Sequence, residues 1–415
     1  MDDETRKEIK RIVNKDKGFK AQEVIILVLI TCIFSFFAGN ATSRMNAIND
    51  KKVEGIKYED MSEDLVEFVK NYQNIINNYY EPVDEGELLR EALKTITEML
   101  DDPYSMFMNE AEYNSLNISL EGSYRGLGIA IYKEKEDEDI IVSHVFEGSP
   151  ADKGGIQEGD IIKSINGTKT ATMTTSEFSQ MVLNSDEDRF VLVTVREKEE
   201  KTITLTKASI VIQSVSSEIY EENGKKIGYI YISIFANNTY KQFKSALDEL
   251  EKEKIDSLII DVRSNTGGYL SAVSTMISLF IDSKHIAYQL EQNGVKTPVY
   301  SKGAKNKSYP IIFLADRYSA SASEVFIASL KDNLNAKVIG EKTFGKGTVQ
   351  ELVTLSSGDQ YKITTKKWLS PKGAWVNDTK GIAPDIEISL PDEYYKNPTF
   401  ENDTQLRRAI EELSK

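Results

Sequence analysis

The chain has 415 residues, of which 40% are hydrophobic, and carries a formal net charge of -15. This acidity argues against nucleic-acid binding, which needs a basic surface. One cysteine and two histidines exclude an internal disulfide framework and argue against a cysteine- or histidine-rich metal site. The length predicts two to three domains.

An uncharged run occupies residues 24–43 and is densely apolar up to Ala38. Its length is near the minimum for a membrane-spanning helix. A buried core helix and a cleavable signal peptide are the alternatives, but the residues after the apolar part form a poor cleavage site. Seven Lys or Arg residues precede the run and four follow it over a similar distance. We therefore expect a cytoplasmic tail at 1–23, an uncleaved signal anchor at 24–43, and the remainder outside the membrane.

Two amphipathic helices are predicted next, because apolar residues recur every three or four positions over 62–79 and 88–100. Pro82 separates them. We interpret residues 44–118 as a helical region used for packing and assembly.

Short strand-like runs and turns fill residues 119–208, including an Asn166-Gly167 hairpin turn. One helix is expected at 175–183, with Thr175 as its cap. This region reads as a separate, mostly β module.

Strands and helices alternate through residues 209–395, which predicts βαβ units and a largely parallel sheet. The fold class is therefore α/β. The expected strands are 227–234, 258–261 and 311–315, and the expected helices are 240–252, 269–280 and 321–330. A strand region at 361–365 and a terminal helix at 405–413, within a C-terminal segment 396–415, complete the chain.

A serine-rich turn at 319–324 follows the strand 311–315 and opens a helix. A helix N-terminus favours negative charge, which suits an oxyanion that develops near a serine. The alternative is that these serines only cap the helix.

A glycine-flanked lysine, Lys346, is the candidate base for such a serine, because neither His144 nor His285 lies in a catalytic setting. Ser–Lys pairs are a known alternative to Ser–His–Asp. The lysine would need burial to lower its pKa toward neutrality. An exposed loop lysine is one alternative. A phosphate-binding loop at 340–347 is another, although its last position lacks the required hydroxyl and a strand-like run follows.

A glycine pair, Gly267-Gly268, ends the segment 261–268 behind a buried strand. Such a turn exposes backbone amides, as an oxyanion hole requires. A simple tight turn is the alternative.

Together, the segments 261–268, 319–324 and 340–350 resemble those of the carboxyl-terminal processing proteases, also called tail-specific proteases. Residues 100–105 and 381–386 match flanking signatures, and the likeness covers about 59–413. The resemblance implies a serine endopeptidase with a Ser–Lys dyad, no metal or other cofactor, and a core of the crotonase/ClpP-like type.

The resemblance also assigns roles to individual residues. It implies the nucleophile Ser321, the general base Lys346, the lysine-positioning Gln350, and oxyanion-hole amides of Gly267 and Ala322. We interpret Glu324 as structural. Trp368 and Trp375 stand where smaller or tyrosine-like residues are expected, which would affect substrate fit.

The β module at 119–208 resembles a PDZ domain. Its carboxylate-binding loop would consist of Arg125, Gly126, Leu127, Gly128 and Ile129. Residues 148–151 and 155–162 match later PDZ signatures. The resemblance implies that the loop amides hold a peptide's terminal carboxylate while the peptide adds to the sheet edge.

The sequence thus predicts a single-pass, membrane-anchored serine endopeptidase whose extracytoplasmic part captures protein C-termini and cuts nearby through an acyl-enzyme. The family likeness further implies a homodimer formed through the terminal helices. Two alternatives remain: a catalytically inactive PDZ adaptor, and a nucleotide-binding protein.

Overall fold

The structure is a computed structural model that describes residues 62–355 and 358–415. Its contacts divide the chain into two compact units, Met1–Leu88 and Leu89–Lys415. The predicted cytoplasmic tail (1–23) and signal anchor (24–43) lie outside the described residues. Within the described ranges, no helix has both the length and the apolar character needed to cross a membrane.

The first unit contains α3 (Glu63–Asn78) and the start of α4 (Glu85–Glu98), which continues into the second unit. The helix predicted to start at Ser62 is confirmed, because the Ser62 hydroxyl oxygen accepts a hydrogen bond from the Leu65 amide at 3.3 Å. A serine at this position satisfies one of the free amides of the first helical turn.

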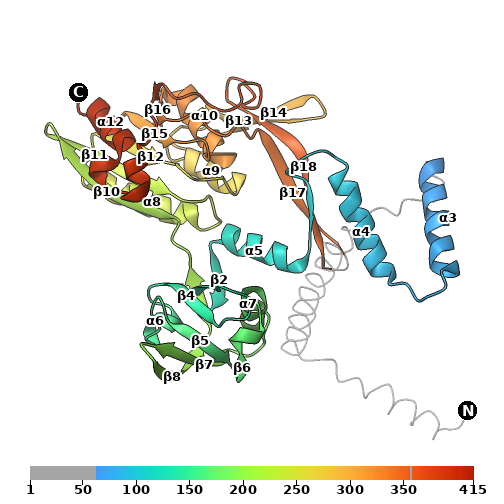
Figure 1. Cartoon of the computed structure of the whole chain (residues 1–415). Helices are drawn as coiled ribbons and strands as arrows, with labels where there is room; N and C mark the ends of the chain where they lie inside the picture. Colours follow the sequence, from blue (N-terminus) through green and yellow to red (C-terminus); the bar gives the residue numbers. More distant parts are fainter. Residues whose placement is uncertain (1–61, 356–357) are drawn as a thin grey trace, which may run out of the picture. The chain divides into compact units, whose positions relative to one another are not determined.

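The β module consists of short strands and helices around its own apolar core, and it lies at the bottom of Figure 1. Its main sheet has the order β3-β4-β5-β7-β8, so β3 is an edge strand. The elements are β2 (Ser123–Gly126), β3 (Ile129–Tyr132), β4 (Ile140–Val145), α6 (Pro150–Lys153), β5 (Ile161–Ile165), β6 (Thr168–Lys169), α7 (Thr175–Leu183), β7 (Arg189–Arg196), β8 (Glu199–Thr206) and β9 (Ala208–Val211).

The predicted helix at 175–183 is confirmed as α7, but its cap lies one residue earlier than expected. Thr174 Oγ1 accepts from the Glu177 amide at 3.1 Å, and the Glu177 carboxylate accepts from the Thr174 amide. This reciprocal arrangement is a capping box, which needs the acidic residue three positions after the cap. Thr174 meets that spacing, and Thr175 does not.

The predicted parallel sheet is confirmed in the order β10-β11-β12-β15-β16-β19. All neighbours from β11 to β19 are parallel, and only β10 at the edge is antiparallel. The strands are β10 (Val215–Glu222), β11 (Lys225–Ile232), β12 (Ser257–Asp261), β15 (Ile311–Ala315), β16 (Lys337–Gly340) and β19 (Ile386–Glu387).

Helices cover both faces of this sheet, which explains the continuous apolar runs of its strands. One face packs against α8 (Thr239–Lys252), α9 (Leu270–Ile277) and α10 (Ala322–Leu334). The other face packs against α12 (Thr404–Leu413). In β15, for example, Phe313 belongs to the first core and Ile312 to the second.

A third sheet was only partly foreseen, because the sequence predicted the strand region near 361–365 and a strand-like run after the lysine loop, which is β17, but not the other partners. It contains β1 (Met106–Met108), β13 (Ile286–Gln292), β14 (Val295–Tyr300), β17 (Thr348–Thr354) and β18 (Gln360–Leu369). Helix α5 (Glu110–Glu121) was also not predicted, and α11 (Asp392–Lys396) precedes α12.

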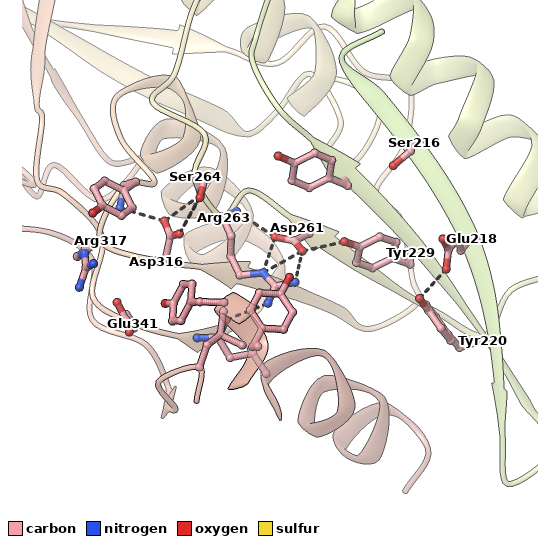
Figure 2. A pocket seen from close by; sticks show the side chains of 16 residues that line it. Ser216, Glu218, Tyr220, Tyr229, Asp261, Arg263, Ser264, Asp316, Arg317 and Glu341 are labelled. Carbon is pink, nitrogen blue, oxygen red and sulfur yellow. Dashed lines mark hydrogen bonds and ion pairs between the residues drawn. The ribbon is translucent and has the colours of Figure 1, made fainter. Parts of the chain in front are cut away.

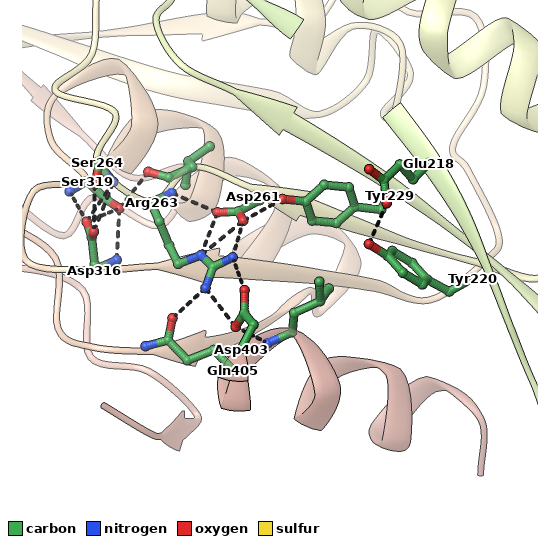
Figure 3. Close-up of polar contacts among 12 residues, drawn as sticks. Glu218, Tyr220, Tyr229, Asp261, Arg263, Ser264, Asp316, Ser319, Asp403 and Gln405 are labelled. Carbon is green, nitrogen blue, oxygen red and sulfur yellow. Dashed lines mark hydrogen bonds and ion pairs between the residues drawn. The ribbon is translucent and has the colours of Figure 1, made fainter. Parts of the chain in front are cut away.

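A buried ion-pair network joins α12 to the end of β12 (Figure 3). The Arg263 guanidinium donates to the Asp261 carboxylate at 2.6 Å and to the Asp403 carboxylate at 2.8 Å. Asp403 also caps α12 by accepting from the Leu406 amide at 2.9 Å. Because Arg263 is followed directly by the loop that contains the glycine pair, this network fixes one side of that loop.

We expect Arg263→Met to lower the free energy of unfolding by about 3–5 kcal/mol, because it leaves two buried carboxylates without their counter-charge. Lys331→Met is the matched control, since Lys331 pairs with Asp385 where both side chains are about a third exposed or more (32% and 40%). That change should cost less than about 1 kcal/mol. Urea denaturation measures both, and equal losses would show that the network does not stabilise the fold.

Candidate active site

One cavity of about 410 Å³ is lined by every residue to which the sequence assigned a catalytic role. These residues come from three separate segments: Gly267 after β12, Ser321 and Ala322 at the start of α10, and Lys346 and Gln350 around the start of β17. All three segments follow strands of the parallel sheet, whose carboxyl ends meet at one edge.

Ser321 lies at a sharp turn between the buried strand β15 and α10. Its backbone has φ +55° and ψ -113°, a conformation that L-residues rarely adopt and that costs about 1–3 kcal/mol. The preceding turn is held in place because the Ser319 hydroxyl donates to the Val262 carbonyl at 2.7 Å and the Ala320 amide to the Asn265 carbonyl at 3.0 Å. This strained turn exposes the Ser321 side chain to the cavity.

A fully buried carboxylate, Glu324, connects the serine turn to the lysine loop. One of its oxygens accepts from the amides of Ser321 at 2.9 Å and Lys346 at 2.8 Å. The other accepts from the Thr343 hydroxyl at 2.6 Å and the Gly345 amide at 2.7 Å. Burial raises the pKa of the Glu324 carboxyl, and these hydrogen bonds counteract that shift. The sequence suggested only a structural role, and the structure shows which two backbone segments it joins.

The glycine pair follows β12 and lies against the serine turn. Gly267 has φ +111°, and a Cβ placed on it would lie 2.9 Å from the Ser321 Cβ, so only glycine fits. The Gly267 amide donates to the Asn265 side-chain oxygen at 2.9 Å. The Ala322 amide, in contrast, makes no hydrogen bond to any described residue, as expected at the first position of a helix. Of the two predicted oxyanion donors, the Gly267 amide is therefore already hydrogen-bonded to Asn265 in this structure, whereas the Ala322 amide is not bonded to a described residue.

The Lys346 loop is clamped by the only two tryptophans of the chain. The Trp368 indole N–H donates to the Lys346 carbonyl at 2.9 Å, and that of Trp375 donates to the Gly347 carbonyl at 3.0 Å. A Cβ on Gly347 would lie 2.3 Å from the Trp375 indole nitrogen. The effect of these tryptophans on substrate fit stays a prediction; Trp368 lines the catalytic cavity, and both indoles also hold the loop backbone.

The Lys346 amine is partly buried in the cavity. Burial, reinforced by the nearby Lys362 ammonium, lowers its pKa to about 8, while Asp102 and Glu324 act in the opposite direction. The amine lies 4.3 Å from the centre of the Tyr104 ring. Among the described residues it makes no hydrogen bond, neither to Ser321 nor to Gln350. The sequence showed the need for burial but not the groups that surround the amine.

Gln350 lines the cavity, but its side-chain nitrogen is directed at two threonines. It donates to the Thr348 hydroxyl at 2.9 Å and to the Thr364 hydroxyl at 3.0 Å. A direct contact between Gln350 and the Lys346 amine is thus absent from the described part of the chain.

A second cavity, of about 320 Å³, lies in the β module between β3 and α7. Four of the five predicted loop residues line it, namely Gly126, Leu127, Gly128 and Ile129. The amides of Leu127 and Gly128 donate to no other described residue. Arg125 does not line this groove, because its guanidinium pairs with Asp188 at 2.8 Å.

Helix α5 contributes to the walls of both cavities, which the sequence did not reveal. Leu116 and Leu120 line the catalytic cavity, and Ile118 lines the groove of the β module. The carboxylate of Glu121, at the end of α5, accepts from the Tyr269 hydroxyl at 3.1 Å. Tyr269 directly follows the glycine pair, so α5 is bonded to the loop that carries it.

A third cavity, of about 420 Å³, contains none of the predicted site residues (Figure 2). It is lined by tyrosines together with Asp261, Arg263 and Asp316. Arg263 pairs with Asp261, and the Asp316 carboxylate accepts from the Ser264 and Tyr318 amides. Within the described ranges, no cluster of three or more His, Cys, Asp or Glu residues could hold a metal ion. His144 and His285 pair with Glu158 and Asp282, respectively.

We expect Glu324→Gln to lower the free energy of unfolding by about 2–4 kcal/mol, because an amide offers one acceptor oxygen where the carboxylate offers two. Hydrogen exchange should accelerate at the Ser321, Gly345 and Lys346 amides. Glu341→Gln is the control, since the Glu341 carboxylate accepts no hydrogen bond from a described residue. Unchanged exchange at those three amides would contradict the role assigned to Glu324.

Comparison with known proteins identifies the domains. The family model described as Peptidase family S41 matches residues 226–388, the PDZ domain model matches 115–196, and the model of the Activating protease CtpB N-terminal domain matches 29–112.

Two curated relatives and one solved structure are similar over most of the chain. The solved structure of the photosystem II D1 C-terminal processing protease covers 80% of this chain and 95% of its own at 24% identity, with a TM-score of 0.48. The carboxy-terminal processing protease CtpA of Bacillus subtilis (strain 168) is 32% identical over 391 residues, covering 92% of this chain and 80% of CtpA. CtpB of the same organism is 36% identical over 364 residues, covering 86% of this chain and 72% of CtpB. At that identity and coverage, the chain belongs to the carboxy-terminal processing proteases, serine endopeptidases of family S41 that carry a PDZ domain.

Proposed function

We propose that Ser321 and Lys346 form the catalytic dyad. The single observation that carries this proposal is that both side chains line one cavity while one buried carboxylate binds both of their backbone amides. The Ser321 hydroxyl attacks the scissile carbonyl and gives its proton to the neutral Lys346 amine. Lys346 then gives this proton to the leaving amine as the peptide C–N bond breaks. Water hydrolyses the resulting ester and restores both groups.

The remaining assignments require small rearrangements when substrate binds. The Ala322 amide is available to the oxyanion, while the Gly267 amide would have to leave Asn265 to join it. The Gln350 side-chain nitrogen donates to the Thr364 hydroxyl in this structure, and a direct contact with the Lys346 amine would need a rotation of the Gln350 side chain. We propose that peptide binding brings these groups into line.

Cleavage of a disordered protein tests the dyad. We expect Ser321→Ala and Lys346→Ala each to reduce kcat/KM by about 10³-fold or more, because each removes one half of the proton transfer. Lys342→Ala, which changes an exposed lysine of the same loop, should retain nearly full activity.

If the chain were an inactive adaptor, Ser321→Ala would have no effect on cleavage. If it bound nucleotide, Lys346→Ala would abolish magnesium-dependent ATP affinity, but the lysine loop leads into strand β17 and not into the helix that such a site needs.

We propose that the PDZ domain captures free C-termini of protein substrates. The proposal rests on the free amides of Leu127 and Gly128 beside an apolar groove, and on β3 being an edge strand to which a peptide can add. Because α5 borders both this groove and the catalytic cavity, peptide binding can act on the glycine-pair loop through Glu121 and Tyr269. Occupancy of the groove would then regulate cleavage.

Two forms of one peptide test this recognition. A substrate with a free C-terminal carboxylate should be cleaved at least 10-fold faster than the same peptide with an amidated C-terminus, because the amide removes the charge that the loop amides bind. Both forms contain the same scissile bond, so the dyad itself is not in question. Equal kcat/KM values for the two would remove carboxylate capture from the mechanism.

We propose that residues 24–43 anchor the protein in the cell membrane, with the catalytic part extracytoplasmic, as the apolar run and the distribution of Lys and Arg indicate.

We also propose that the protein forms a homodimer. Support comes from α3, which has no buried residue and exposes Leu65, Phe68 and Ile75 by 42%, 51% and 54%. An apolar stripe of this kind is typical of a helix that packs against a partner.

A further inference from the structure

The Lys346 amine has a specific neighbour that no step of the proposed reaction uses. Its nitrogen lies 4.3 Å from the centre of the Tyr104 ring, within the range of a cation–π interaction. The amine makes no hydrogen bond to another described residue. In this structure, therefore, the amine contacts the Tyr104 ring and is not hydrogen-bonded to the Ser321 hydroxyl.

Tyr104 lies in a turn at residues 102–105 that several hydrogen bonds hold in place. The Asp102 carboxylate accepts from the Tyr104 amide at 3.1 Å and from the Ser105 hydroxyl at 2.6 Å. The Ser105 oxygen in turn accepts from the Thr364 amide at 3.0 Å, which fixes the turn to β18. β1 continues this attachment, since Met106 pairs with Lys362. None of these contacts involves Lys346, so the position of the Tyr104 backbone does not depend on the lysine.

The same contacts extend to Gln350. Its side-chain nitrogen donates to the Thr364 hydroxyl, and the amide of Thr364 binds the Ser105 side chain of the Tyr104 turn. The turn, β18 and the start of β17 therefore form one connected frame around the lysine side chain.

An aromatic face attracts a charged ammonium much more strongly than a neutral amine. The Asp102 and Glu324 carboxylates also favour the charged form, and the Lys362 ammonium opposes it. These are the charged groups that act on the amine from the elements around it: the turn before β1, α10 and β18. The ring position therefore suits the protonated lysine, whereas a proton acceptor must be neutral.

We propose that Tyr104 is a positioning residue whose ring holds the Lys346 ammonium in a second position, which the amine leaves on deprotonation to reach Ser321. This inference rests on the proposed role of Lys346 as the base. It gives Tyr104 one effect on the reaction: the ring stabilises the charged lysine before the substrate is attacked, and it releases the amine once the amine has lost its proton.

The pH profile of kcat/KM tests the proposal. Activity should rise through a pH near 8 in the wild-type full-length protein, because only the deprotonated amine accepts a proton. Tyr104→Leu removes the ring and should move this acidic limb to lower pH by about half to one unit, since the charged form loses its stabilisation. Tyr104→Phe keeps the ring face and should leave the limb in place. Lys362→Met removes a like charge and should move it to higher pH.

A purely structural role predicts a different pattern. Tyr104→Leu would then lower activity at every pH and leave the limb where it is, and that result would overturn the proposal. A limb that moves equally in Tyr104→Phe would also contradict it, because the ring face would not be responsible. Full activity of Lys346→Ala would instead refute the dyad itself, so the two failures are distinguishable.

A second measurement follows the lysine in the wild-type protein and uses a variant only to assign its resonance. The ¹H resonance of the Lys346 ε-methylene, assigned by its loss in Lys346→Ala, should be shifted upfield by the ring below pH 8. The shift should disappear as pH rises through that value. An ε-methylene resonance at its ordinary position throughout the titration would show that the ring does not hold the ammonium.

Discussion

The buried Glu324 carboxylate is the contact on which the active-site geometry depends. It fixes the backbone of the serine turn and of the lysine loop to each other, and it holds Ser321 in a conformation that serine rarely adopts. The indole N–H groups of Trp368 and Trp375 hold the same loop by binding the Lys346 and Gly347 carbonyls. The backbone of both residues is thus rigid, while the long lysine side chain remains adjustable. Catalysis of the proposed kind needs both properties, because the amine must change its protonation state without displacing the serine.

The glycine-pair loop lies between two attachments of different strength. On one side, the buried network of Asp261, Arg263 and Asp403 ties it to α12. On the other side, a single hydrogen bond from Tyr269 to Glu121 connects it to α5, which also borders the PDZ groove. We propose that the buried network on one side, together with this single bond to the helix that borders the groove on the other, allows the loop to respond to peptide without loss of the fold.

Sequence reasoning succeeded where a signal is local. Continuous apolar runs predicted parallel strands with both faces covered, and the serine turn, glycine pair and lysine loop were recognised from residues adjacent in the chain. All three line one cavity. The resemblance to the processing proteases, which the comparisons confirm, led to the choice of Ser321 among the three serines of the turn. The catalytic role of Ser321 stays a prediction.

What the sequence missed depends on contacts between distant segments. Residues 100–105 were noted only as a flanking signature, because nothing local shows that Tyr104 lies beside a lysine more than two hundred positions later. Glu324 was interpreted only as structural, because its bonds to the lysine loop exist only in the folded chain. The contribution of α5 to the walls of the two cavities was also missed, because the sequence did not predict that helix.

The most direct test is a structure of the protein with a peptide boronate bound to the active-site serine. We expect a tetrahedral adduct on Ser321 Oγ, with the Lys346 amine within about 3 Å of it and away from the Tyr104 ring. The hydrogen bonds of Glu324 should be unchanged. An adduct on another residue, or one on Ser321 with the amine still on the ring, would contradict the Ser–Lys mechanism.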